Sequence, residues 1–406
     1  MECVCEKRVV WKKFELRMGV ARGITMKDNP VRVLHVLGTT NLGGAESRVM
    51  ELYRAINKER VQFDFLVHTD TQGHYDKEIQ NLGGSIYHVP RFKGINYLAY
   101  RKALTDFFRE HHDYVAVQGH MTSTASIYLP IAKQAGIPIT IAHARSAGVD
   151  RAVKGLLTKI LRRSLKKKAD YCFTCSAKAA EAVYGKGWVQ KGNVWTIPNA
   201  IDAKRFEYNI DTRKQIRSVL NVSDKFVVGH VGRFGFMKNH AYVLDVFGEL
   251  CKKRADAVLI LIGTGTLEEE MKAKAKAMGL EDKIQFLGNH SDVECYYQAF
   301  DYFVFPSFFE GFPGSVLEAQ AAGLHCLVSD HVTREVALTE LVSYRSIEEP
   351  AAVWANEIAA NSEQHKTRES KSAQIIEKGF DVRQQAAKME AFYISGKNPP
   401  GKKTEI

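Results

Sequence analysis

The stretch VRVLHVLGTTNLGGAE, residues 31–46, decides the fold. Its first part, Val31–Leu37, is a short and mostly apolar run, which is typical of a buried parallel strand. The glycine-rich turn GTTNLGGAE follows, and residues 45–56 then show apolar positions at helical spacing. Strand, glycine turn and helix in this order predict the opening of a doubly wound α/β domain.

The same alternation continues along most of the chain. Helical patterns separate most of the further strand-like runs, which fall at residues 63–68, 85–88, 114–118, 137–143, 171–174, 226–234, 257–265, 283–288, 302–307 and 326–330. Proline and polar residues interrupt the pattern in VWTIPNAIDAKRF, residues 194–206. The sequence therefore predicts two successive β/α domains with a seam in that segment.

The composition restricts the class of protein. The chain has 406 residues, too many for one ordinary core, and no apolar run near the length of a membrane-spanning helix. Seven scattered cysteines do not suit a secreted disulfide framework, so we expect a cytoplasmic protein. Residues 1–199 carry 31 Lys and Arg against 17 Asp and Glu, whereas residues 200–406 carry 26 against 29. The basic half predicts an anionic partner: nucleic acid, a lipid surface or phosphates.

Ligands of open parallel sheets bind beyond the carboxyl ends of the strands, and this rule selects candidate residues in both halves. In the second half it selects Arg233 and Lys238, whose guanidinium and ammonium groups suit a diphosphate. In the first half it selects Gly43 and Gly44, where backbone N–H groups and a helix N-terminus could face phosphates. Solvated loop charges and simple turn glycines explain the same residues, so these fragments alone leave both interpretations open.

The segment EGFPGSVLE, residues 310–318, begins and ends with a carboxylate. Gly311 permits close approach of the backbone to a ligand, and Pro313 restricts the turn. Glu318, just inside a predicted helix, could accept two hydrogen bonds from a vicinal diol such as a ribose, and Glu310 could accept hydroxyl groups of a sugar. The alternative is that Glu318 complements the helix dipole and Glu310 is solvated.

The strand-end rule also selects His120 and the GTG turn at residues 263–265. His120 precedes a Ser/Thr-rich helix start, where it could bind a ligand or move a proton. A capping or packed histidine is the alternative. His143 and Arg145, at the end of the next predicted strand, are weaker candidates of the same kind.

Taken together, GGAE, IPNAID, VGRFGFMKN, LIGTG and EGFPGSVLEAQAAG occur in the order and rough spacing of the retaining glycosyltransferases of family four. Over about residues 31–395 the chain most resembles the glycosyltransferases of bacterial exopolysaccharide and capsule synthesis. The resemblance implies the GT-B fold, an α/β architecture in which two Rossmann-like, doubly wound domains face each other across a cleft. It implies transfer of a sugar, with retention, from a nucleotide-sugar donor to a glycan or lipid-linked acceptor. UDP is the favoured nucleotide, and no metal or other cofactor is expected.

The resemblance also implies roles for individual residues. Arg233 and Lys238 are expected to grip the diphosphate, Glu318 to bind the ribose, and Glu310 and His120 to face the donor sugar. Four of these residues are expected to act in catalysis: Glu310, His120, Arg233 and Lys238. The expected nucleotide-sugar site consists of Gly43, Gly44, Arg233, Lys238, Gly263, Gly265, Gly311, Phe312, Pro313 and Glu318.

The expected domain limits combine the composition and the pattern breaks with this resemblance, which implies the returning C-terminal helix. They are a disordered extension at 1–29, an acceptor-binding domain at 30–197, a nucleotide-sugar-binding domain at 198–378, a helix at 379–395 that returns to the N-terminal domain, and a flexible tail at 396–406. The first 25 residues are basic, lack periodicity and precede the second methionine, Met26, so an upstream start that is not the natural one is a further interpretation.

One segment suggests where an acceptor is met. Residues 151–168 contain eight Lys or Arg and no acid, and their apolar residues follow helical spacing. A basic amphipathic helix is typical of a membrane-surface element, here the inner face of the cell membrane. A helix packed on the core with a solvated basic face is the equal alternative.

Two other functions fit parts of the sequence. A nucleotide-sugar 2-epimerase shares the two-domain layout, although the pattern at residues 310–323 favours a transferase. A nucleic-acid-binding protein would suit the basic half. The basic residues gather in one helix, however, and we find no stacking platform or groove-reading motif, so nucleic acid is not expected as a partner.

Overall fold

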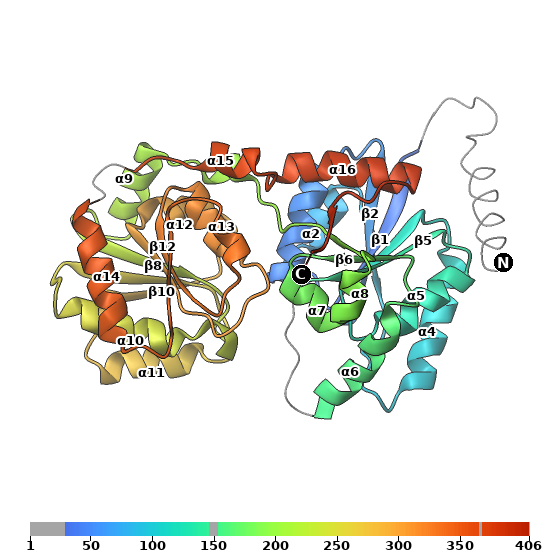
Figure 1. Cartoon of the computed structure of the whole chain (residues 1–406), viewed down its shortest axis with the longest axis horizontal. Coiled ribbons are helices and arrows are strands. Elements are labelled where there is room, and N and C mark those ends of the chain that lie inside the picture. The colour runs from blue at the N-terminus through green and yellow to red at the C-terminus, as the bar shows by residue number, and fades with distance from the viewer. Residues whose placement is uncertain (1–28, 146–152, 365–367, 406) are drawn as a thin grey trace. The chain divides into compact units, whose positions relative to one another are not determined.

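The computed structural model describes residues 29–145, 153–364 and 368–405 (Figure 1). The chain divides into two compact units. Unit 1 extends to Pro198 and resumes at Ala386, and unit 2 consists of Asn199–Gln385. This division falls inside the interrupted segment at 194–206. The extension expected at residues 1–29 lies outside the described residues except for its last position.

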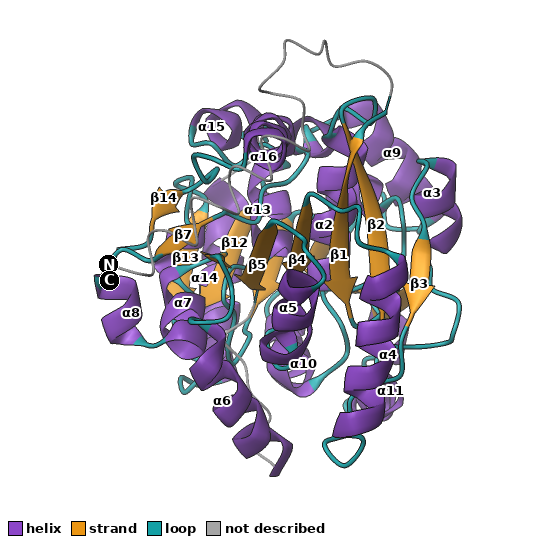
Figure 2. Cartoon of the chain, turned by 90° about the vertical axis from the view of Figure 1, so that its right-hand side faces the viewer, coloured by secondary structure: helices purple, strands orange, loops and turns teal. Residues whose placement is uncertain are grey.

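Unit 1 is built on an eight-stranded sheet with the order β14-β7-β6-β5-β4-β1-β2-β3. All described neighbours are parallel except β14 and β7. Figure 2 shows β5, β4, β1, β2 and β3 side by side. The strands are β1 (Val31–Leu37), β2 (Val61–Val67), β3 (Ile86–His88), β4 (Ala116–Gly119), β5 (Ile139–Ala144), β6 (Tyr171–Thr174), β7 (Val194–Thr196) and β14 (Lys402–Lys403).

Buried clusters cover both faces of this sheet. Successive residues of a strand point to opposite faces, so a single strand contributes to both clusters. Leu34 and Val36 of β1 join a buried cluster with residues of α4 and α5, whereas Val33 and Leu37 join a second cluster with residues of α2 and α16. The helices are α2 (Gly44–Ala55), α3 (Asp76–Asn81), α4 (Tyr97–Glu110), α5 (Ala125–Gln134), α6 (Val153–Leu165), α7 (Ala177–Tyr184), α8 (Lys186–Gln190) and, from Ala386 onward, α16 (Val382–Ser395).

The last residues of the chain differ from the expectation of a flexible tail at 396–406. Lys402 and Lys403 form β14, which pairs antiparallel with Trp195 and Thr196 of β7. The backbone N–H of Thr404 also donates to the carbonyl of Val194, at 2.8 Å. Backbone pairing does not depend on side-chain polarity, so a polar segment can complete an open sheet edge, which the composition of this segment did not reveal.

Unit 2 is built on a second, fully parallel sheet of six strands with the order β10-β9-β8-β11-β12-β13. The strands are β8 (Phe226–Val231), β9 (Ala257–Ile262), β10 (Ile284–Gly288), β11 (Tyr302–Phe305), β12 (His325–Ser329) and β13 (Val342–Arg345). The helices are α9 (Ile210–Val219), α10 (His240–Cys251), α11 (Glu268–Ala277), α12 (Val293–Ala299), α13 (Gly314–Ala321), α14 (Ala351–Gln364) and α15 (Ser372–Glu377). Apart from the short antiparallel β14, both described sheets are parallel, so each unit is an α/β unit and the predicted fold class is confirmed.

Within the described residues, no helix has both the length and the apolar character that crossing a bilayer requires.

Candidate functional site

The candidate site of unit 2 lies at the carboxyl ends of β8, β9 and β11. These strands are neighbours in the order β9-β8-β11, so the loops that follow them meet at one edge of the sheet. The backbone N–H of Phe308 donates to the carbonyl of Met237, at 2.9 Å. The side-chain amide of Asn239 donates to the carbonyl of Pro306, at 3.2 Å. Two segments about 70 residues apart in sequence are thus fastened together.

Lys238 and Glu310, both predicted as catalytic, form an ion pair in this loop cluster. Lys238 Nζ lies 2.8 Å from Glu310 Oε1, and the side chains are 19% and 22% exposed. The ammonium lies 4.3 Å from the centre of the Phe305 ring, a favourable cation–π position. The stem of Lys238 passes over Gly232, where an added Cβ would lie 3.1 Å from its Cδ and Cε atoms. The pair is therefore held in place while still reaching solvent.

Arg233 lies in the same loop and is exposed. In the described part of the chain, its guanidinium forms no ion pair. A guanidinium without a carboxylate partner keeps its planar set of N–H donors available for an anion such as a phosphate.

Gly263 and Gly265 allow the loops after β8 and β9 to pack backbone against backbone. A Cβ at Gly263, whose φ is +139°, would collide with the carbonyl oxygen of Gly232, and one at Gly265 would collide with that of Phe234. Both glycines were expected in the nucleotide-sugar site, and in this structure they permit a close approach between two segments of the chain itself. These glycines position the loop that contains Arg233 and Lys238.

Glu318 lies in the second turn of α13 and is 6% exposed. Its Oε2 accepts a hydrogen bond from the hydroxyl of Tyr297, at 3.0 Å. The helix has no acidic residue in its first turn, and the dipole acts mainly there, so dipole compensation does not explain this carboxylate well. Tyr297 was not predicted, because a tyrosine 21 positions away in sequence gives no local signal.

The turn between the two carboxylates is buried. Gly311, Phe312 and Pro313 are all buried, and Pro313 is the N-cap of α13. The Phe312 ring is stacked on Phe380 at 5.2 Å, and the amide of Asn199 donates to the Phe312 carbonyl at 3.2 Å. The side chain of Phe312 therefore belongs to the core of unit 2, a role that its place in the motif did not indicate.

In unit 1, the predicted glycine pair begins α2. Gly43 is the N-cap, and the carboxylate of Glu46 folds back so closely that a Cβ at Gly43 would collide with it. A Cβ at Gly44 would meet no atom within 4 Å. A carboxylate beside a helix N-terminus is stabilised by the helix dipole, so Glu46 occupies a position that also favours anions.

His120 follows β4 at the same edge of the sheet and is bonded through both ring nitrogens. Its Nε2 lies 3.0 Å from His35 Nδ1, and Arg145 Nε donates to its Nδ1 at 3.2 Å. Because an arginine can only donate, Nδ1 of His120 accepts and its proton is on Nε2, from where it is donated to His35. His35 must then carry its own proton on Nε2, which has no partner among the described residues.

A second buried chain of hydrogen bonds ends at His143. The Tyr393 hydroxyl donates to Gln118 Oε1 at 2.5 Å, so the amide nitrogen of Gln118 donates to His143 Nδ1 at 2.9 Å. The ring centres of His143 and His120 are 5.4 Å apart. The weaker candidates His143 and Arg145 are thus brought beside His120, whose ring packs between those of His35 and His143.

Burial keeps these rings neutral. It lowers the pKa of His35 to about 3 and the pKa values of His120 and His143 well below the ordinary value, and the positive charge of Arg145 adds to each shift. Burial lowers the pKa of Arg145 only to about 10, so Arg145 keeps its charge at neutral pH. His120 is therefore a neutral ring whose tautomer Arg145 fixes.

The described end of α6 bears on the basic segment 151–168. Leu165 is fully buried and Leu161 packs on the same core cluster, whereas Lys159 and Arg163 are exposed. The leucine side chains at this end of the helix therefore pack in the core of unit 1. The side chains of the earlier apolar positions lie outside the described residues.

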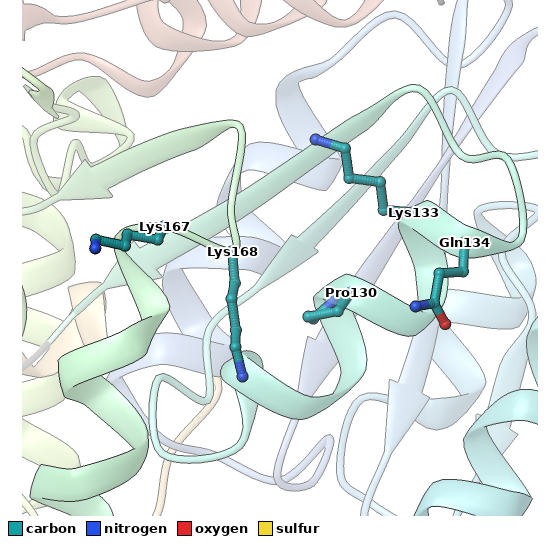
Figure 3. Close-up of a pocket in the computed structure, with 5 residues that line it drawn as sticks. All are labelled: Pro130, Lys133, Gln134, Lys167 and Lys168. Atoms are coloured by element: carbon teal, nitrogen blue, oxygen red, sulfur yellow. The ribbon is translucent and has the colours of Figure 1, made fainter. Parts of the chain in front are cut away.

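A hollow of about 320 Å³ lies beside the last turn of α5 and the residues after α6 (Figure 3). Its lining residues are Pro130, Lys133, Gln134, Lys167 and Lys168, and none of them belongs to the predicted site. Lys133 pairs with Asp170, and Lys168 donates to the carbonyl of Ser126 at 2.9 Å. Two of its three lysines already have partners, so this hollow is not a candidate for the main site.

Comparisons with known proteins identify similar proteins over most of the chain. The family profile described as Glycosyltransferase Family 4 matches residues 42–205, and the profile described as Glycosyl transferases group 1 matches residues 211–379. The chain is 32% identical over 376 residues to EpsF of Bacillus subtilis (strain 168), provisionally named a glycosyltransferase; the match covers 91% of this chain and 97% of EpsF.

A second relative has a more detailed name. The chain is 24% identical over 310 residues to the UDP-Gal:alpha-D-GlcNAc-diphosphoundecaprenol alpha-1,3-galactosyltransferase of Escherichia coli, with 74% of this chain and 79% of that protein covered. Among solved structures, HepE of Anabaena in complex with UDP and glucose matches with a TM-score of 0.73 at 17% identity, covering 90% of this chain and 100% of HepE. At this low sequence identity, the similarity to HepE shows a shared fold and nothing about activity.

The buried histidines predict that stability falls with acid. Their pKa values in the folded chain lie below the ordinary value, so the unfolded chain binds more protons as the pH falls below about 6.5. We expect each such histidine to remove up to about 1.4 kcal/mol of unfolding free energy per pH unit in that range. His35→Asn, whose amide oxygen can replace the Nδ1 acceptor, should unfold in urea with a shallower pH dependence between pH 7.5 and 5.5. Equal slopes for the variant and the parent chain would contradict this account.

Proposed function

Because the chain belongs to the family-4 glycosyltransferases of the GT-B fold, we propose that it transfers a sugar from a UDP-sugar to a glycan or lipid-linked acceptor, with retention at the anomeric carbon. The single observation that carries this proposal is the Lys238–Glu310 pair, which joins a cation and a carboxylate in the loop cluster to which the exposed Arg233 also belongs. The two cations can bind the phosphates of a sugar diphosphate, and the carboxylate can accept hydrogen bonds from its sugar.

The proposed roles follow from the charges of these groups. Arg233 and Lys238 bind the diphosphate and stabilise the negative charge that builds up as the bond from the anomeric carbon to the phosphate oxygen breaks. Glu310 accepts hydroxyl groups of the donor sugar, and Glu318 binds the ribose. The acceptor oxygen attacks on the face that the diphosphate leaves, and its proton passes to the departing phosphate oxygen.

The residues of unit 1 have supporting roles in this proposal. Gly43 and Gly44 supply the backbone at the start of α2, near which phosphates or the acceptor bind. His120 contacts the donor sugar as a neutral, oriented ring. Since Arg145 and His35 occupy both its ring nitrogens, a contact through nitrogen requires one of these hydrogen bonds to be exchanged.

The nucleotide and the acceptor are proposed from relatives. The name of the Escherichia coli relative specifies a UDP-Gal donor and an acceptor linked to diphosphoundecaprenol, and HepE was solved with UDP and glucose. We propose action at a membrane surface for the same reason. Metal independence is also part of the proposal, since two cationic side chains can neutralise the leaving group without a metal ion.

The proposal is tested by the identity and stereochemistry of the product. We expect a UDP-sugar, within a panel of nucleotide sugars, to raise the unfolding temperature, and NMR to show the donor's anomeric configuration in the product. Inversion would exclude the retaining mechanism. Release of an altered free nucleotide sugar without any acceptor would favour the 2-epimerase alternative, and salt-dependent DNA binding without nucleotide-sugar binding would favour a nucleic-acid-binding protein.

Lys238→Met should lower kcat about a hundredfold or more, because methionine keeps the aliphatic packing over Gly232 but removes the charge that stabilises the leaving group. The measurement is steady-state kinetics with the donor found in the panel. Lys252→Met, at a 70% exposed lysine of unit 2, is the matched control and should keep full activity. Full activity in Lys238→Met would refute the assigned role.

Glu318→Gln should weaken UDP binding about tenfold, because a neutral amide is a poorer acceptor for the ribose hydroxyls than a carboxylate. Calorimetric titration with UDP measures this affinity without requiring the acceptor. Glu281→Gln, at an exposed position of unit 2, is the control. An unchanged affinity, with the fold intact by circular dichroism, would remove Glu318 from the nucleotide site.

A further inference from the structure

Unit 1 exposes large apolar side chains where β3 leads into α4. Ile95 is 97% exposed, Leu98 is 79% exposed and Tyr97 is 43% exposed. Scattered single apolar residues on a surface are ordinary, but these three lie within four positions of one another. We call residues 91–102 the apolar tip.

The apolar tip is an ordered turn. The side chain of Asn96 accepts from the backbone N–H of Lys93 at 2.7 Å and donates to the carbonyl of Arg91 at 3.0 Å. Gly94 supplies the positive φ of +86° that the turn requires. Phe92 anchors the segment, with its ring 5.2 Å from that of the buried Tyr100. Local hydrogen bonds and packing thus fix the backbone that presents the aliphatic side chains to solvent.

Positive charges flank these side chains. Arg91, Lys93, Arg101 and Lys102 are exposed, and no acidic residue occurs in the sequence between Glu78 and Asp106. Lys102 pairs with Asp106 at 2.6 Å, which leaves the other three charges uncompensated by sequence neighbours. Aliphatic groups surrounded by cations match an anionic lipid surface, which offers an acyl layer beneath phosphates.

The position of the apolar tip suits this use. It follows β3, which is parallel to β2 and, through it, to β1, so it lies at the carboxyl edge of the sheet. Gly43, after β1, and His120, after β4, belong to the same edge. Figure 2 shows α4 reaching beyond the arrowhead end of β1.

We propose that the apolar tip docks unit 1 on an anionic membrane, with Ile95 and Leu98 entering the boundary between headgroups and acyl chains. Arg91, Lys93 and Arg101 then face lipid phosphates. The docking itself does not depend on the proposed function. Its purpose rests on that function: docking would bring the sheet edge with the predicted acceptor residues to a lipid-linked substrate. It assigns membrane contact to residues 91–102, whereas the sequence suggested residues 151–168.

The test uses the full chain and vesicles of phosphatidylcholine alone or mixed with phosphatidylglycerol. We expect co-sedimentation with the mixed vesicles only, and a loss of about tenfold or more when Ile95→Ser and Leu98→Ser are combined. Ile210→Ser combined with Val219→Ser, at exposed apolar positions of unit 2, is the matched control and should bind like the parent chain. Calorimetric UDP binding should be the same in all three proteins, so a failure of docking is distinguished from a failure of the proposed function.

Further variants separate the possible causes. Lys93→Gln with Arg101→Gln should also weaken binding to the mixed vesicles, and added salt should weaken the binding of the parent chain. Equal binding to both vesicle types would overturn the proposal. So would loss of binding in Lys167→Gln with Lys168→Gln while the Ile95 and Leu98 variant still binds. A dimer that dissociates in the Ile95 and Leu98 variant, without any vesicle binding by the parent chain, would assign the patch to self-association.

Discussion

Parallel pairing of β8 with β11 is the constraint on which the candidate site of unit 2 depends. Parallel neighbours end at the same edge, so the loop that carries Lys238 must lie beside the loop that carries Glu310. One backbone hydrogen bond and one from the Asn239 side chain fasten the two loops, and Gly263 and Gly265 let the loop after β9 close against the loop after β8. The fastened backbone thus brings Lys238 and Glu310 together, and the contacts of the lysine side chain with Gly232 and Phe305 limit the side-chain entropy that the ion pair costs.

Sequence patterns predicted what depends on local order. Val31–Leu37 is a strand with the expected limits, and the strand-end rule placed Lys238 and Glu310 at one edge. The same patterns missed what depends on distant partners. The bond from Tyr297 to Glu318 and the packing of Phe312 on Phe380 join residues that have no fixed spacing. The bonds that hold His120 come from other strands, so its environment could not be read from its neighbours in sequence.

The basic residues of unit 1 occur in at least two different structural settings. At the described end of α6, exposed lysine and arginine side chains surround leucines that serve the core. At the apolar tip, the cations surround side chains that no core residue covers. Both segments have the composition of a membrane element, and only side-chain burial separates them. Composition indicates how many basic residues a unit has, whereas the fold decides which apolar residues remain for a partner.

Residues 386–406 belong to unit 1 although the whole of unit 2 precedes them in the chain. Phe392 and Tyr393 are fully buried among residues of unit 1, and Tyr393 satisfies the amide oxygen of Gln118. During synthesis, unit 2 leaves the ribosome complete, whereas unit 1 waits with part of its interior open until the final helix emerges. A ribosome that stops just after Gln385 would therefore release a chain in which unit 2 is complete and unit 1 is not.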